Sequence, residues 1–232
     1  LAPKSRNHLR NTLRLFFGWA VKNDYLSATH RLLEAASMER ETITGEETDF
    51  YRHAELRAIL DAADETMRQI IALQGLAGIR LQEAQRLTWS DVFGTAGHIA
   101  ITATKSKTRQ RRLVEICPAL AEWLRPYREK EGPLWTEHRD TWHARFTELR
   151  EAHKIPARKN GLRHGFVTFH FALHGNENLT AAQAGHTPGM VHANYKGLAT
   201  RKQARAWFAV KPAKGSATGK ILHVPGLDRS AA

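Results

Sequence analysis

The chain has 232 residues and a mass of 26.2 kDa, enough for one full domain with its own core plus a fragment of another. Its 35 Lys and Arg against 23 Asp and Glu give a net charge of +12, which favours a polyanionic partner such as nucleic acid over a merely basic soluble protein. A single cysteine, Cys117, excludes a disulfide framework and a thiolate metal cluster. No apolar run reaches membrane-spanning length and no signal-peptide pattern opens the chain, so we expect no membrane partner and, by default, a cytoplasmic location.

Residues 6–25 predict an amphipathic helix with basic residues on its polar face. A helix with so apolar a face needs another element to pack against, yet only a short segment follows before the polar residues at 41–50. We therefore expect residues 1–40 to be the C-terminal fragment of an earlier helical domain, and the polar residues 41–50 to be a linker. The apolar face of the helix consists of Leu9, Leu13, Phe16, Phe17 and Ala20.

From Tyr51 the apolar pattern becomes regular and predicts a mostly helical (α+β) domain over 51–210 with one small antiparallel hairpin. The hairpin strands are expected at 98–104 and 111–116, where β-branched residues flank a basic turn. The tail, 211–232, is rich in Gly, Ser, Pro and Lys, and we expect it to be flexible or ordered only against a partner. Helices are expected at 53–65, 66–77, 81–88, 118–129, 139–152, 161–174, 178–185, 188–195 and 200–209.

Two basic features precede the C-terminal half of this domain. Arg80, in the segment GIRLQE, lies between two apolar helices, where Glu83 could orient it by an ion pair. Taken alone, Arg80 is more simply a surface arginine with buried methylenes. The turn TKSKTRQRR can carry a lysine that delivers a proton to a leaving oxygen. Its individual cations are better interpreted as a solvated loop that touches DNA phosphates: Lys105, Arg109, Arg111 and Arg112.

The stretch from Asn160 to Lys196 contains Arg163, His186 and Tyr195. An arginine can grip a phosphate with its planar fork of donors, a histidine can donate to the same phosphate, and a tyrosine can be a covalent nucleophile. Each residue alone is a weak signal, and Tyr195 alone would more often be a packing tyrosine. Their spacing makes the combination specific, because 23 positions separate Arg163 from His186 and 9 separate His186 from Tyr195.

Taken together, these motifs resemble the tyrosine recombinase family of the phage-integrase type, over residues 50–209. That family has an arginine after the second helix of its catalytic domain, a hairpin lysine, an HxLRH box, an LGH-type box and a tyrosine nine residues later. Residues 1–40 resemble the end of the family's helical core-binding domain. The resemblance assigns the site to Arg80, Lys107 (with Lys105 as the second candidate for the lysine), Arg163, His186 and Tyr195.

The sequence departs from the family pattern at two positions. Asn160 replaces the first histidine of HxLRH; asparagine can hydrogen-bond a phosphate oxygen but cannot transfer a proton near neutral pH. Ala184 replaces the usual leucine before Gly185, which is a change in packing. With Asn160 in the box, a neutral His186 or a water is left as the proton acceptor from Tyr195.

The resemblance implies a reaction on double-stranded DNA that uses no metal and no cofactor. A tyrosine attacks the phosphate and forms a 3′-phosphotyrosyl link, and a tetramer on DNA exchanges the strands. Two alternatives remain: a DNA-binding module on the same scaffold that no longer catalyses, and a type IB-like topoisomerase.

Three further features are interpreted as follows. His164 is more often a satisfied core histidine than a catalytic one. His170 and His174 are spaced like zinc ligands but lack the glutamate of HExxH and a third ligand, so no metal site is expected. The helix at 200–209 carries Ala204, Trp207 and Phe208, which could dock on a neighbouring protomer, as the family resemblance implies, or pack in cis.

Overall fold

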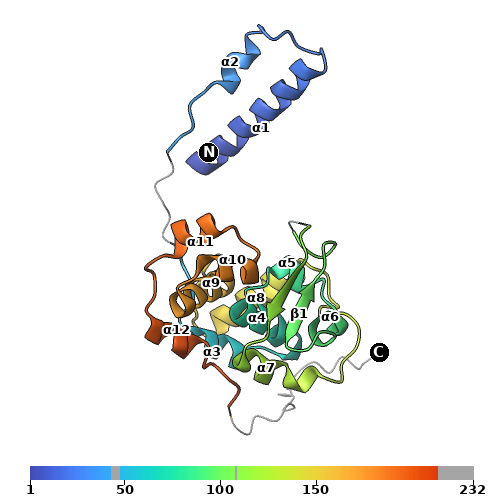
Figure 1. The fold of residues 1–232 in the computed structure, drawn as a ribbon, viewed down its shortest axis with the longest axis vertical. Coiled ribbons are helices and arrows are strands. Elements are labelled where there is room, and N and C mark those ends of the chain that lie inside the picture. Colours follow the sequence, from blue (N-terminus) through green and yellow to red (C-terminus); the bar gives the residue numbers. More distant parts are fainter. Residues whose placement is uncertain (43–47, 108, 214–232) are drawn as a thin grey trace, which may run out of the picture. The chain divides into compact units, whose positions relative to one another are not determined.

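The computed structural model describes residues 1–42, 48–107 and 109–213, and it separates the chain into two units, Leu1–Glu47 and Thr48–Ala232 (Figure 1). The predicted mostly helical (α+β) class is confirmed, since helices dominate the described residues and the sheet has two strands. No helix in these ranges is long and apolar enough to cross a bilayer. Most of the tail predicted at 211–232, and part of the linker predicted at 41–50, lie outside the described residues.

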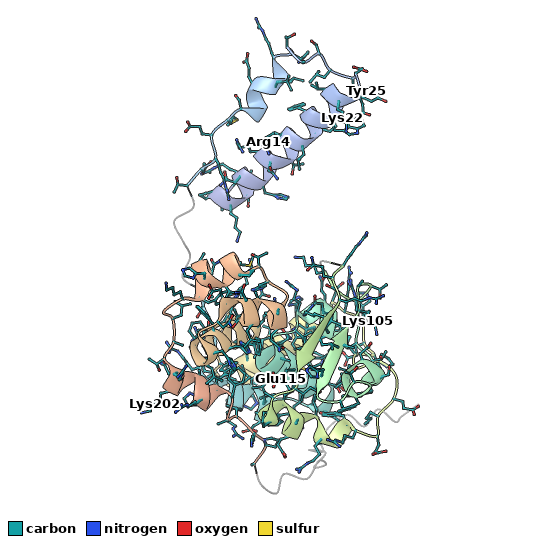
Figure 2. All side chains as sticks on the ribbon, in the orientation of Figure 1. Arg14, Lys22, Tyr25, Lys105, Glu115 and Lys202 are labelled. Atoms are coloured by element: carbon teal, nitrogen blue, oxygen red, sulfur yellow. The ribbon has the colours of Figure 1, made fainter. Side chains whose placement is uncertain are left out.

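The first unit is a pair of helices, α1 (Pro3–Lys22) and α2 (Leu32–Ala36). Proline suits the first turn of a helix, where its missing N–H has no partner to lose. Leu9 and Phe16, both on the predicted apolar face, stay about half exposed, at 50% and 56%. Figure 2 shows Arg14 and Lys22 along α1.

The core of the second unit begins with α3 (His53–Ala62) and α4 (Glu65–Ala77), close to their predicted ranges. Asp64 caps α4, because its carboxylate accepts the Met67 backbone N–H at 3.0 Å. Gly78 ends α4 with a positive φ of 62°. A Cβ at Gly78 would lie 2.2 Å from the ring of Phe166, so a glycine is required for α9 (Gly161–His174) to approach this close.

The helix predicted at 81–88 is shorter than expected: α5 covers only Leu81–Ala84, and a helix that the sequence did not predict, α6 (Trp89–Phe93), follows. Thr88 starts α6 with a capping box, in which its N–H and hydroxyl both donate to Asp91, at 2.7 and 2.6 Å. The Trp89 ring stacks on Tyr127 with centroids 5.0 Å apart. The capping box and the ring stacking end one helix and start the next, and the spacing of apolar residues in the sequence predicts neither contact.

The hairpin consists of β1 (His98–Ile101) and β2 (Arg112–Glu115), paired antiparallel with Ile99 opposite Val114. Ile99 and Val114 are fully buried and anchor one face of the sheet on the core. The strands are shorter than predicted, which leaves a wide basic turn between them. Figure 2 shows Lys105 in this turn.

Helix α9 is the centre of the C-terminal half, and it is contacted by α4, α10 (Glu177–Ala184), α11 (Pro188–Tyr195) and α12 (Arg201–Trp207) (Figure 1). Trp207 of α12 is fully buried, and its indole N–H donates to the Gly75 carbonyl at 2.8 Å. The helix predicted at 200–209 therefore packs in cis, which was one of its two interpretations. The remaining elements are α7 (Pro118–Leu124), η1 (Arg125–Tyr127), α8 (Thr141–Ala152), α9 (Gly161–His174), α10 (Glu177–Ala184), α11 (Pro188–Tyr195) and α12 (Arg201–Trp207).

Candidate active site

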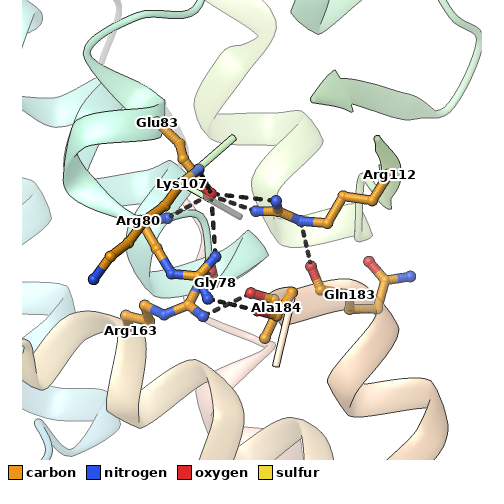
Figure 3. Close-up of polar contacts among 9 residues, drawn as sticks. Gly78, Arg80, Glu83, Lys107, Arg112, Arg163, Gln183 and Ala184 are labelled. Carbon is orange, nitrogen blue, oxygen red and sulfur yellow. Dashed lines mark hydrogen bonds and ion pairs between the residues drawn. The ribbon is translucent and has the colours of Figure 1, made fainter. Parts of the chain in front are cut away.

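Three arginines from distant parts of the sequence meet around one buried carboxylate, and we call them with Glu83 the arginine cluster (Figure 3). Glu83, at 1% exposure, accepts hydrogen bonds from Arg80 at 3.1 Å and from Arg112 at 2.6 Å. Burial alone would raise the pKa of Glu83, but the hydrogen bond and charge of Arg112 and the charge of Arg80 outweigh it and lower the pKa to about 2. Glu83 is therefore ionised at neutral pH and holds both guanidinium groups in place.

The third arginine of the cluster, Arg163, lies in the first turn of α9 and is 8% exposed. Its guanidinium donates to the carbonyl of Gly78 and to that of Ala184, the latter at 2.6 Å. Burial, followed by the charge of Arg80, lowers the pKa of Arg163 to about 9. No carboxylate in the described ranges forms an ion pair with Arg163, so a bound anion would relieve a cost that the protein itself leaves in place.

Gly185 allows the end of α10 to approach this cluster. Its φ is 65°, and its carbonyl accepts a hydrogen bond from Arg80. A Cβ at this position would lie 3.1 Å from a guanidinium nitrogen of Arg80 and 3.2 Å from one of Arg112. The predicted glycine–histidine pair is thus needed for close packing as well as for His186, because a larger residue would push the arginines aside. The replaced leucine position, Ala184, is fully buried.

Tyr195 ends α11 and is only 4% exposed. Its hydroxyl lies 2.6 Å from Nδ1 of His164. The Tyr195 ring is close to two imidazoles, with centroid distances of 5.8 Å to His164 and 6.2 Å to His186. Burial raises the pKa of Tyr195, while the nearby charge of Arg163 acts in the opposite direction. We call Tyr195, His164 and His186 the tyrosine group.

The interpretation of His164 as an ordinary core histidine misses this contact with the proposed nucleophile. The only signal in the sequence is that His164 directly follows Arg163 on a helix that begins at a functional motif. Burial and the charge of Arg163 lower the pKa of His164, so its imidazole is neutral at pH 7. A neutral imidazole has one nitrogen that donates and one that accepts, and it is Nδ1 of His164 that faces the Tyr195 hydroxyl.

His186 also stays neutral. Burial, and then the charges of Arg163 and Arg80, lower its pKa to about 3. Its Nδ1 is buried and has no hydrogen-bond partner among the described residues. His186 therefore adds polarity next to the arginine cluster without adding a fourth positive charge.

The cations of the hairpin turn fall into separate classes. Lys105 is ion-paired with Asp91, whereas the side chain of Lys107 is exposed and its backbone N–H donates to Glu83 at 3.3 Å. Arg109 and Arg111 are exposed, as a contact with DNA phosphates would require. The interpretation of Arg112 as a solvated loop residue is wrong, since its side chain is 10% exposed and paired with Glu83.

Asn160 is exposed and stands at the N-cap of α9 in the left-handed region, with a φ of 54°. It lines a groove of about 560 Å³ on the side of α8, together with Trp142, Phe146 and Lys159. No hydrogen bond within the described part of the chain joins its side chain to Tyr195. Of the six residues predicted as catalytic, the structure brings together the side chains of Arg80, Arg163, His186 and Tyr195 and the backbone of Lys107. Asn160 lies at the edge of this site.

The two histidines with zinc-like spacing have another role in the fold. Nδ1 of His170 is 2.8 Å from the Thr180 hydroxyl, and the His170 ring lies 4.3 Å from that of His174. No group of three His, Cys, Asp or Glu side chains placed to hold a metal occurs in the described ranges.

Known proteins resemble this chain in both sequence and fold. Residues 49–196 match the model of the phage integrase family. The comparison with curated proteins found no match.

Three solved structures show the likeness in fold. A lambda integrase dimer on a COC′ core site is 15% identical, covers 85% of this chain and 75% of that chain, and has a TM-score of 0.65. A lambda integrase tetramer on a Holliday junction is 15% identical, covers 79% of this chain and 59% of that chain, and has a TM-score of 0.61. The catalytic domain of bacteriophage HP1 integrase is 24% identical, covers 64% of this chain and 87% of that chain, and has a TM-score of 0.52. Because the family model spans most of the chain and the fold agrees, this protein belongs to the phage integrase family of tyrosine recombinases.

Proposed function

We propose that this protein is a site-specific recombinase that cuts and rejoins double-stranded DNA through a 3′-phosphotyrosyl link to Tyr195, without a metal or cofactor. One observation carries the proposal. Consecutive residues at the start of α9 face the two halves of the site, with Arg163 in the arginine cluster and His164 on the Tyr195 hydroxyl. A phosphate gripped by Arg163 would therefore lie beside the nucleophile.

The arginine cluster supplies the charge that phosphoryl transfer needs. Arg80 and Arg163 carry paired donors that match the nonbridging oxygens of a phosphate, and lysine lacks that fork. Because Glu83 and backbone carbonyls already orient the guanidinium groups, little reorganisation is needed as charge develops. His186, neutral and next to both arginines, would donate to the same phosphate.

Lys107 is the proposed acid that protonates the departing 5′-oxygen. Its exposed side chain extends from the turn whose backbone is tied to Glu83, so it starts close to the arginine cluster and can still move. Lys105 is the weaker candidate, because it would first have to leave Asp91.

The partner that fits this site is duplex DNA, bound by a homotetramer during strand exchange. The net charge of +12 favours binding to DNA phosphates, and exposed Arg109 and Arg111 flank the site, with Lys105 beside them. Residues 1–40, as part of a core-binding domain, would add contacts on DNA. A DNA-binding module without catalysis is the second candidate, favoured by Asn160 and by the burial of Tyr195 at 4% exposure.

The test is covalent capture of DNA. The protein is incubated with a pool of nicked duplexes that carry randomised arms, so that cleavage releases a short fragment and traps the enzyme on DNA. We expect an adduct that survives denaturation in the wild type and in Tyr127→Phe, whose tyrosine is as buried as Tyr195 but donates to the Glu65 carbonyl outside the site, but not in Tyr195→Phe. Salt-sensitive DNA binding with no adduct in the wild type would leave only the binding module.

A further inference from the structure

The hydroxyl of Tyr195 has one hydrogen-bond partner in the described structure, and that partner is His164. The bond joins α11 to the first turn of α9 across 2.6 Å, and both side chains are largely shielded from solvent. At this distance the two atoms share a short, well-made hydrogen bond. For the phenol to donate, Nδ1 must be the bare nitrogen of the neutral imidazole, so this direction requires the His164 tautomer that carries its proton on Nε2.

Asn160 is not placed to do the same work. Its side chain lies on the groove beside α8, and an amide cannot take up a proton near neutral pH. The His186 ring is stacked near the Tyr195 ring, with centroids 6.2 Å apart, and no hydrogen bond among the described residues joins it to the Tyr195 hydroxyl. Of Asn160, His164 and His186, only His164 lies within hydrogen-bond distance of the Tyr195 oxygen.

We propose that His164 is the proton acceptor for Tyr195 in DNA cleavage, a role that the sequence pattern leaves vacant at Asn160. This inference rests on the proposed function. As the Tyr195 oxygen forms its bond to phosphorus, its proton moves to Nδ1 of His164. The bond from phosphorus to the 5′-oxygen breaks, and Lys107 supplies the proton for that oxygen. In rejoining, the 5′-hydroxyl returns its proton to Lys107, and His164 returns its own proton to the leaving phenolate.

The surroundings of His164 keep it ready to accept. It is faced by Tyr195 from α11, His186 from the end of α10, Arg163 on its own helix and Asp49 from the segment before α3. Burial and Arg163 favour the neutral imidazole, and Asp49 acts the other way. When DNA binds, the phosphate charge would offset that of Arg163 and make the imidazole a stronger base at the moment of attack.

Two substitutions of His164 distinguish its two functions, which are to hydrogen-bond the Tyr195 hydroxyl and to accept the proton of that hydroxyl. His164→Asn keeps an acceptor oxygen near the position of Nδ1 but cannot be protonated, and His164→Ala removes both functions. The matched control is His170→Asn, because His170 is another buried histidine of α9 that bonds a hydroxyl, that of Thr180. The readout is the single-turnover rate of adduct formation on a trapped suicide duplex.

We expect His164→Asn and His164→Ala both to lose about 10²–10⁴-fold in rate, the usual range for general acid–base catalysis. Their rates should rise with pH, as hydroxide takes over the deprotonation of Tyr195, whereas the wild-type rate should fall only at acid pH. His170→Asn should keep the wild-type pH profile. Replacing Tyr195 by difluorotyrosine, whose phenol is more acidic, should rescue His164→Asn but not Lys107→Ala.

A measurement without DNA separates the failure of this inference from the failure of the proposed function. In nitrogen NMR of the histidine-labelled free protein, His164 should carry its proton on Nε2, and Tyr195→Phe should shift its Nδ1 signal. If the wild type forms an adduct but His164→Asn matches it in rate and pH profile, His164 is not the acceptor. If the wild type forms no adduct, the proposed function fails, and the NMR result alone then decides whether the hydrogen bond exists.

Discussion

The two faces of the first turn of α9 hold charge in opposite ways. On the face of Arg163, three guanidinium groups are fixed by a buried carboxylate and by backbone carbonyls. On the face of His164, the tyrosine group consists of two neutral imidazoles and a protonated phenol. The protein thus separates a permanent positive charge, suited to hold a phosphate, from neutral groups that can exchange a proton without burying an unpaired charge.

On the face of Arg163, the largest expected effect comes from changing the geometry of the arginine cluster without changing its charge. Arg163→Lys keeps one positive charge, but a single ammonium cannot reach the carbonyls of Gly78 and Ala184 and also bind a phosphate with two donors. We expect the rate of adduct formation to fall by about 10²–10³-fold. Single-turnover cleavage of a suicide duplex measures this change.

The control for that change is Arg201→Lys, since Arg201 is exposed on α12. It should leave the rate unchanged. An Arg163→Lys protein that cleaves as fast as the wild type would show that the fork of donors is not needed, and the contrast between the two faces would then be one of charge alone.

The next effect is on stability. Glu83→Gln removes the carboxylate shared by Arg80 and Arg112 and leaves their charges without a buried counter-charge. Breaking a buried ion pair on one side costs roughly 3–5 kcal/mol, so we expect the free energy of unfolding to fall by about that much. Urea denaturation measures it.

Glu122→Gln is the matched control, because Glu122 forms an exposed ion pair with Arg125. Exposed pairs contribute little, so this variant should unfold like the wild type. Equal, small losses in both variants would mean that Glu83 does not organise the cluster.

The most gradual effect is that of pH. The folded-state pKa values of His186 and His170 are about 3, against an ordinary value of 6.5, and that of Glu83 is about 2, against 4.5. All three are lowered on folding, so each contributes stability above its ordinary pKa and loses it as pH falls. We expect the free energy of unfolding to decrease below about pH 6.5, through the histidines, and further below about 4.5, through Glu83.

Urea denaturation between pH 7 and pH 4 checks this order. His186→Gln should reduce the slope below pH 6.5, because the histidine that resists protonation beside the arginine cluster is then absent. Stability that is flat or rises as pH falls from 7 to 5 would contradict neutral histidines on this face of the site.

Local patterns predicted the helices of the core well where the hydrophobic period alone decides them. The helices predicted at 161–174 and 188–195 have those bounds, and α4 begins one residue earlier than predicted. The period failed at 81–88, where the capping box of Thr88 and the stacking of Trp89 start a new helix. The stacking of Trp89 depends on Tyr127, which is distant in sequence, and the capping box of Thr88 and Asp91 is a local polar contact that hydrophobic periodicity does not register.

The sequence by itself determined the family and the set of candidate site residues, because the motif spacing brings an arginine, a histidine and a tyrosine into a specific order. It could not determine which neighbour each side chain would meet. Only the tertiary structure placed Arg112 on Glu83 and His164, not Asn160, on the Tyr195 hydroxyl. The physical reason is that these contacts join the hairpin to α5 and α9 to α11, so they depend on how separate elements pack. Even adjacent residues such as Arg163 and His164 contact different elements.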